Sequence, residues 1–222
     1  MDNEISLNVI LVSCENKEGL VDNCNHPELP PCGILGVIEQ KNPNAVFLSS
    51  GGTYQLLKRN RFNVIDFAEY TSAPQMKDGL VKSIDYKIHS SILAQNFIPE
   101  DLEFLQNNDL LKIDAVFTNF KRLDTNGISK INTMERLEEY RSRIDLGGPL
   151  MCMTSRKGFL NTVLLTDPND YRSLVDDLNQ NDDKCSLSFR IKMLKKSNII
   201  LDEYNASINK LFSLLDESLR IE

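Results

Sequence analysis

The chain alternates short apolar runs with stretches of helical pattern, and this alternation constrains its fold more than any other feature. Residues 7–13 are rich in β-branched side chains and end in polar ones, as a buried strand does. Similar runs follow at residues 45–48, 64–67, 113–119 and 162–165. Helical patterns occur at residues 54–60, 90–95, 99–107 and 133–143. Such alternation predicts an α/β fold with a mostly parallel central sheet flanked by helices.

The C-terminal part departs from this alternation and is mainly helical. Asp167 and Pro168 suit the N-cap and first turn of a helix that we expect to run to about residue 178. Residues 186–219 are helical in pattern almost throughout. A length of 222 residues suits one large domain. We therefore expect a single domain over residues 1–222, with a sheet-containing core at 1–166 and extra C-terminal helices within 167–222.

The charge balance limits the classes of partner. Lys and Arg total 25 against 32 Asp and Glu, so the net charge is -7. A role centred on nucleic acid or anionic membrane would need a broad basic surface, so we expect neither partner. No apolar run approaches the length of a membrane span, and the acidic N-terminus lacks the basic region of a signal peptide. We expect a cytoplasmic protein whose partner is a small molecule.

The cysteines and histidines do not predict a metal site. The chain has five cysteines, an odd and scattered set that suggests reduced thiols. Cys24, His26 and Cys32 are near one another, but their spacing matches no common zinc signature and a fourth ligand is missing. We interpret residues 23–31, which contain three prolines, as a surface loop.

The strongest local signal is a strand followed by Ser50-Gly51-Gly52-Thr53 and a helix. Two glycines let the backbone approach an anion closely, and a helix N-terminus points N–H groups at it. A tight strand–helix turn also contains glycine for steric reasons alone. The motif is therefore a candidate anion site, not proof of one.

The first strand ends in a second polar loop, which contains Ser13 and Lys17. In open α/β sheets, ligands sit at the carboxyl ends of the strands, so the two loops can meet at one site. A lone lysine in a loop is usually just solvated, but here Lys17 is placed to pair with a phosphate.

Four further residues could carry acid–base chemistry if the fold brings them together. Asn119 ends an apolar strand, Asp145 follows a predicted helix, and Lys82 and Lys157 lie in separate segments. A carboxylate and two lysines can polarise a carbonyl and move its protons. Taken singly, each charge is as readily a surface residue.

In order along the chain, these motifs resemble the inosine monophosphate (IMP) cyclohydrolase domain of the bifunctional purine-biosynthesis enzyme. The matching segments are residues 13–21, 50–53, 71–82, 89–93, 114–119 and 144–157, with 167–171 and 186–212 near the C-terminus. The resemblance covers nearly the whole chain, and the transformylase half of that enzyme is absent. It implies a methylglyoxal-synthase-like fold. It also implies dehydrating ring closure of 5-formamidoimidazole-4-carboxamide ribotide to IMP, without cofactor or metal.

The resemblance assigns a role to each matching residue. Asp145 matches the aspartate that handles the carboxamide proton, and Asn119 the asparagine beside the heterocycle. Lys82 and Lys157 match lysines that polarise the formyl oxygen and assist loss of water. The phosphate-binding loops are matched by Ser13, Lys17, Ser50, Gly51, Gly52 and Thr53. Ser83, Gly147 and Gly148 match positions that bind the rest of the substrate.

Several residues depart from the pattern of that family, and most lie near the expected site. Leu80 replaces an arginine, and Lys121 replaces a catalytic tyrosine, for which it could substitute as a proton donor. Glu18 replaces a threonine of the first phosphate loop, where its charge would oppose a phosphate unless the side chain turns away. Residues 23–31 form an insertion. These changes question the usual substrate more than the fold.

Three functions remain open at this stage. The leading one is an IMP cyclohydrolase, as a possible homodimer. The second is a divergent cyclase that closes another formylated amino-carboxamide in specialised metabolism. The third is a regulator that binds a purine nucleotide without turning it over. The joint presence of Lys82, Asn119, Asp145 and Lys157 argues against the third, since a phosphate sensor needs only the loops.

Overall fold

The computed structural model describes residues 4–74, 81–121, 123–124 and 131–216. Its central element is a sheet of five described strands in the order β4 (Val64–Asp66), β3 (Val46–Ser49), β2 (Val9–Cys14), β5 (Ala115–Asn119) and β6 (Val163–Leu165). All neighbouring pairs in this sheet are parallel. The predicted α/β architecture is confirmed, and all five predicted strands lie within it.

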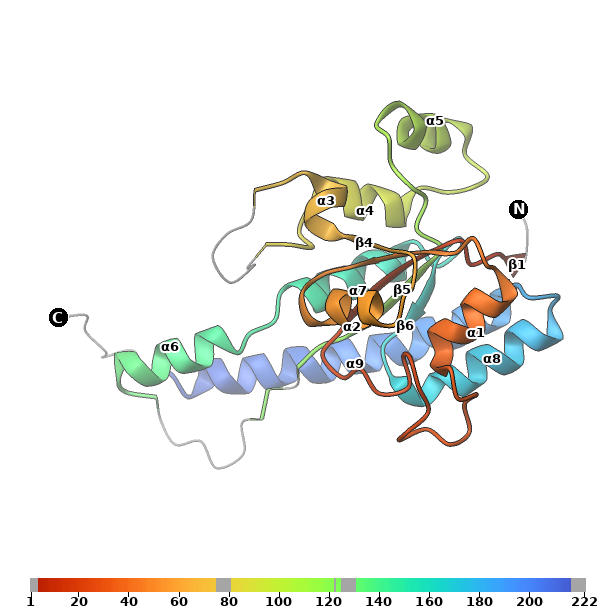
Figure 1. Ribbon diagram of the computed structural model, residues 1–222. Helices are drawn as coiled ribbons and strands as arrows, with labels where there is room; N and C mark the ends of the chain where they lie inside the picture. The colour runs from red at the N-terminus through yellow and green to blue at the C-terminus, as the bar shows by residue number, and fades with distance from the viewer. Residues whose placement is uncertain (1–3, 75–80, 122, 125–130, 217–222) are drawn as a thin grey trace.

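Helices cover both faces of the sheet because successive side chains of a buried strand point to opposite sides. In β2, Ile10 and Val12 belong to a hydrophobic core with Ile34 of α1 (Gly33–Lys41) and Leu174 of α8 (Tyr171–Gln180). Leu11 belongs to a second core on the other face. That core includes residues of α3 (Phe67–Thr71), α4 (Tyr86–Leu93), α7 (Gly147–Lys157) and α9 (Leu187–Ser213). Figure 1 shows the resulting three layers.

The remaining elements lie around these layers. Helix α5 (Pro99–Asn107) stands away from the sheet at the top of Figure 1, and α6 (Met134–Ser142) lies beside the far end of the long α9. β1 (Glu4–Ile5) pairs antiparallel with β7 (Cys185–Ser186) in a separate two-stranded sheet. A short 3-10 helix (Pro168–Asp170) precedes α8, and the Asp167 side chain caps it by accepting a hydrogen bond from the Asn169 backbone N–H. The predicted helix start at Asp167-Pro168 is therefore confirmed.

Three of the described helices, α1, α3 and α7, were not predicted from the sequence. Helix α7 begins with Gly147-Gly148-Pro149, residues that favour a turn, although proline is well tolerated in a first helical turn. Helix α1 follows the proline-containing loop and includes Gly33 and Gly36, which have low helix propensity. Helices α1 and α7 are stabilised by burial against the sheet rather than by the helix propensity of their residues. Leu80 and residues 125–130 lie outside the described residues, as do the last residues of the predicted 186–219 helix.

Within the described part of the chain, no helix combines the length and the apolar character needed to cross a membrane.

Candidate functional site

A cavity of about 370 Å³ opens at the carboxyl edge of the sheet. It lies over the ends of β3, β2 and β5 and beside the first residues of α2 (Gly51–Arg59) and α7. Chain order reverses between the central strand β2 and its neighbour β5. Such a switch point is where open parallel sheets bind ligands. Most of the predicted site residues line this cavity: Ser13, Lys17, Ser50, Gly51, Gly52, Thr53, Lys82, Ser83, Asn119, Asp145, Gly147 and Gly148.

One end of the cavity has the features of an anion site. Helix α2 starts at Gly51, whose φ of 55° is a left-handed conformation that favours glycine. The Ser50 side chain makes no capping hydrogen bond, so the helix N-terminus is not closed by its own N-cap side chain. A Cβ atom on Gly51 would lie 3.4 Å from Nζ of Lys82, and one on Gly52 would lie 3.7 Å from Cε of Lys17. Two lysines and a helix N-terminus thus converge on one point.

Two residues at this end also make internal contacts. The Thr53 hydroxyl donates a hydrogen bond to the Cys14 carbonyl oxygen at 3.1 Å, which ties α2 to the end of β2. Lys17 Nζ donates to the Glu15 carbonyl oxygen at 3.1 Å. Thr53 is therefore buried and hydrogen-bonded to the backbone. Lys17 uses one of its donors within its own loop.

Asp145 lines the same cavity, two residues before α7 begins. Its Oδ1 accepts a hydrogen bond from the Gly148 backbone N–H at 3.1 Å. Burial raises the pKa of the Asp145 carboxyl, against the lowering effect of the Gly148 and Gly147 N–H groups. A carboxylate with a raised pKa is a better proton acceptor, which suits a general base. A Cβ atom on Gly147 would lie 2.5 Å from the Ser83 hydroxyl, which would have to move away.

Tyr204 of α9 fixes the backbone of Asp145, and sequence reasoning did not find it. Its hydroxyl donates to the Asp145 carbonyl oxygen at 2.9 Å and accepts from the Asp145 N–H at 2.8 Å. The Tyr204 ring also packs edge-to-face on Phe120, with centroids 4.9 Å apart. The two residues are 59 positions apart in the sequence, so no local pattern signals this contact.

Asn119 holds the neighbouring loop in place. Its Oδ1 accepts a hydrogen bond from the Asn16 N–H at 2.7 Å, and its Nδ2 donates to the Asn16 carbonyl oxygen at 2.9 Å. Both ends of the carboxamide are thus engaged by the loop that follows β2. This placement makes Asn119 a positioning residue for that loop rather than a free partner for a heterocycle.

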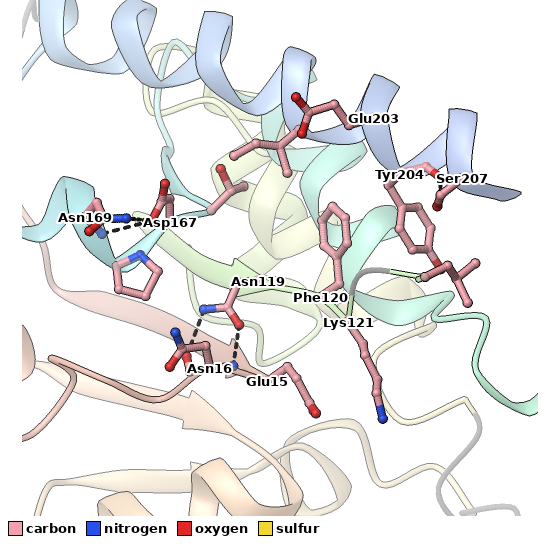
Figure 2. Close-up of a pocket in the computed structure, with 14 residues that line it drawn as sticks. Glu15, Asn16, Asn119, Phe120, Lys121, Asp167, Asn169, Glu203, Tyr204 and Ser207 are labelled. Carbon is pink, nitrogen blue, oxygen red and sulfur yellow. Dashed lines mark hydrogen bonds between the residues drawn. The ribbon is translucent and has the colours of Figure 1, made fainter. Parts of the chain in front are cut away.

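Lys121 lies in a second, larger cavity. This cavity has a volume of about 590 Å³ and extends over β5 and the residues after β6 to α9. It shares Glu15 and Asn119 with the first cavity. Figure 2 shows the hydrogen-bonded pair Asn16 and Asn119 in the lining of this cavity. The Glu15 carboxylate and the Lys121 side chain extend away from α9. Phe120, Tyr204 and Ile200 make part of the lining apolar.

Lys157 is not brought to either cavity. It is the last residue of α7, whose first residues line the first cavity. Eleven helical residues place the two ends of α7 about 15 Å apart. The predicted role of Lys157 on the same substrate atoms is therefore not supported by its position.

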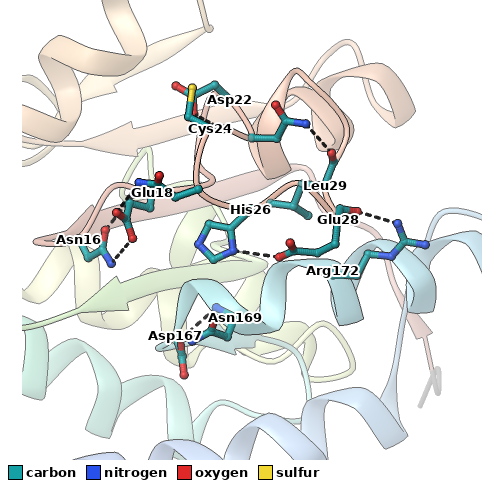
Figure 3. A network of polar contacts seen from close by, with 12 residues as sticks. Asn16, Glu18, Asp22, Cys24, His26, Glu28, Leu29, Asp167, Asn169 and Arg172 are labelled. Carbon is teal, nitrogen blue, oxygen red and sulfur yellow. Dashed lines mark hydrogen bonds and ion pairs between the residues drawn. The ribbon is translucent and has the colours of Figure 1, made fainter.

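Glu18 turns away from the first cavity and binds the inserted loop. Its carboxylate accepts hydrogen bonds from Asn16 Nδ2 at 3.1 Å and from Asn25 Nδ2 at 2.6 Å. The loop is held in turn by Arg172, which donates to the Glu28 carbonyl oxygen at 2.7 Å. Figure 3 shows this network beside the loop after β2. The expected conflict between Glu18 and a bound phosphate is resolved by this orientation.

The same loop offers no metal centre. Nδ1 of His26 lies 2.9 Å from Oε1 of Glu28, and Cys24 is exposed. Nowhere in the described ranges do three or more histidine, cysteine, aspartate or glutamate side chains gather in a group able to hold a metal ion.

Comparison with known proteins supports the resemblance seen in the sequence. The bifunctional purine biosynthesis protein PurH of Trichormus variabilis is 34% identical over 198 residues, which cover 89% of this chain and 36% of that protein. PurH of Magnetococcus marinus is 29% identical over 210 residues, covering 95% of this chain and 36% of that protein. The chain therefore spans about one third of the length of the curated relatives it matches. No family model matches it.

A solved structure shares the fold. The crystal structure of ForH superposes with a TM-score of 0.73, covers 93% of this chain and all of that chain, and is 23% identical. At this identity the likeness shows a common fold and nothing finer. Together with the PurH matches, it confirms the methylglyoxal-synthase-like α/β fold expected from the sequence. The chain is a divergent homologue of the cyclohydrolase domain of the PurH family.

Proposed function

We propose that this protein catalyses the dehydrating ring closure of 5-formamidoimidazole-4-carboxamide ribotide to IMP. The observation that carries the proposal is the convergence in one cavity of a helix N-terminus, Lys82 and the half-buried carboxylate of Asp145. The relationship to PurH supports the reaction class, because those relatives are named as purine biosynthesis proteins.

The reaction needs three things from the protein. Asp145 accepts the proton of the carboxamide nitrogen, and this nitrogen attacks the formyl carbon. Lys82 stabilises the charge that develops on the formyl oxygen and donates a proton to it. The formamide N–H gives up the second proton, so that the oxygen departs as water. The N–H groups at the start of α2, with Ser50 and Lys17, hold the phosphate. Holding both reacting groups of one molecule at close range supplies much of the remaining acceleration.

An absorbance assay tests the proposal. Purified protein is mixed with the formylated ribotide, and formation of a hypoxanthine nucleotide is followed. Turnover that disappears in Lys82→Met supports the proposal. Absence of turnover, or equal rates in the parent and Lys82→Met proteins, contradicts it.

The second cavity favours one alternative, a cyclase for a different formylated amino-carboxamide. At about 590 Å³ the second cavity is larger than the first, and the two share Glu15 and Asn119 in their linings. A substrate with a further substituent on its ring would reach it. Lys121, which has no partner among the described residues, would then contact that substituent.

A tryptophan on α9 distinguishes the two substrates. Ser207 lines only the second cavity, whereas Ser213 is exposed on the same helix and lines neither. If the substrate extends into the second cavity, Ser207→Trp lowers its kcat/KM about tenfold or more, and Ser213→Trp does not. IMP affinity is expected to stay equal in both variants. Equal kcat/KM values for the two variants would contradict the extended substrate.

A further inference from the structure

The loop after β2 carries two glutamates with opposite placements. Glu15 lines both cavities, and no hydrogen bond or ion pair joins its carboxylate to another described residue. Only its backbone is engaged, through the N–H that donates to the Asn119 carbonyl oxygen and the carbonyl that accepts from Lys17. The Glu15 side chain is therefore a free charge facing the site.

Glu18 has the same charge but a different role. Its carboxylate is held by Asn16 and Asn25, and it lines neither cavity. Glu18, whose charge was expected to oppose a bound phosphate, therefore points away from the cavity. The glutamate that faces the site is the one three residues earlier.

Glu15 changes the charge balance of the cavity. The charged side chains among the described lining residues are Lys17, Lys82, Glu15 and Asp145. Two positive charges therefore meet two negative ones, and no arginine lines the cavity within the described ranges. A phosphate monoester carries close to two negative charges at neutral pH, so each carboxylate that lines the site opposes its binding.

The charge of Glu15 is felt inside the cavity. Burial is the main cause of the raised pKa of Asp145, and the charge of the Glu15 carboxylate also raises it. Glu15 and the start of α2 line the same cavity as Asp145, with Gly51 and Gly52 among its lining residues. An anion bound at the start of α2 would share this cavity with the Glu15 carboxylate and would be repelled by it.

Ribose offers Glu15 a favourable partner where phosphate does not. A carboxylate at the end of a strand can accept hydrogen bonds from sugar hydroxyls, as in dinucleotide-binding folds. We propose that Glu15 is the specificity-determining residue at the sugar-phosphate end of this site. It weakens binding of a phosphate dianion, so that the site distinguishes only weakly between a purine ribotide and the uncharged riboside. This inference rests on the proposed function for the identity of the ligand.

Binding of IMP and inosine to three proteins tests the inference. The proteins are the parent, Glu15→Gln and Glu18→Gln, and dissociation constants are measured by titration calorimetry. The two variants remove the same charge from the same loop. In the parent, IMP is expected to bind no more than about tenfold more tightly than inosine. Glu15→Gln is expected to tighten IMP about tenfold, since one repelling charge at close range is removed, and to change inosine less than about threefold.

The control and the contrary outcomes separate this inference from the proposed function. Glu18→Gln is expected to leave IMP unchanged or weaken it, because it loosens the contact with Asn25. If both ligands bind and Glu15→Gln does not tighten IMP, the inference is wrong and the proposed function stands. If neither ligand binds any of the three proteins, the inference and the proposed function both fail.

Discussion

Asp145→Asn is expected to reduce kcat for ring closure about 10²- to 10⁴-fold, the range for loss of a general base. Asparagine keeps the shape of the side chain and an oxygen that accepts the Gly148 N–H, so α7 and the cavity are preserved. What is lost is the carboxylate that accepts the carboxamide proton. IMP affinity is expected to change far less than kcat, because asparagine still offers an oxygen to the ring N–H that IMP keeps.

The pH dependence gives a second readout of the same residue. Burial raises the pKa of Asp145, and the base is active only when ionised. As pH falls through this raised pKa, kcat is therefore expected to decline at a pH above the usual range of aspartate. Asp109→Asn is a suitable control, since Asp109 is exposed and has a φ of 52° that asparagine tolerates. Equal kcat values in Asp145→Asn and Asp109→Asn would show that Asp145 is not the base.

Arg190→Met is expected to lower the free energy of unfolding by about 3–5 kcal/mol, as does breaking other buried charged contacts. Arg190 is only 2% exposed, and its guanidinium donates to the carbonyl oxygens of Phe159, Leu160 and Cys185. Methionine fills similar space but leaves these carbonyls without their donor. The contacts join the start of α9 to the segment after α7, so the residue connects the C-terminal helix to the layer that carries Asp145.

Urea unfolding measures this effect. Lys192→Met is the matched control, because Lys192 is exposed on the same helix. Its unfolding free energy is expected to stay within about 0.5 kcal/mol of the parent. A loss of less than about 1 kcal/mol in Arg190→Met would mean that the three carbonyls find other partners.

The sheet and the place of the site were predictable because both depend on local pattern. Apolar runs such as residues 113–119 identified the strands, and the ends of parallel strands meet at one edge. The glycines after β3 marked the helix N-terminus that now forms the anion end. These features need only short segments of sequence.

The missed features depend on contacts between distant segments. Tyr204 reaches Asp145 across 59 positions. Glu15 and Glu18 could not be told apart, because Asn25 in the inserted loop decides which of them turns away. The position of Lys157 was not foreseen because no helix was predicted at residues 147–157, and an 11-residue helix carries its last residue away from the cavity. Packing of α7 on the sheet, rather than propensity, decides that point.

A crystal structure of the protein with bound IMP tests the central claim most directly. The claim predicts the phosphate at the N–H groups that open α2, near Lys17 and Lys82, and the heterocycle against Asp145 and the start of α7. A phosphate placed instead in the cavity between β5, β6 and α9, with the heterocycle of IMP out of reach of Asp145, would contradict it.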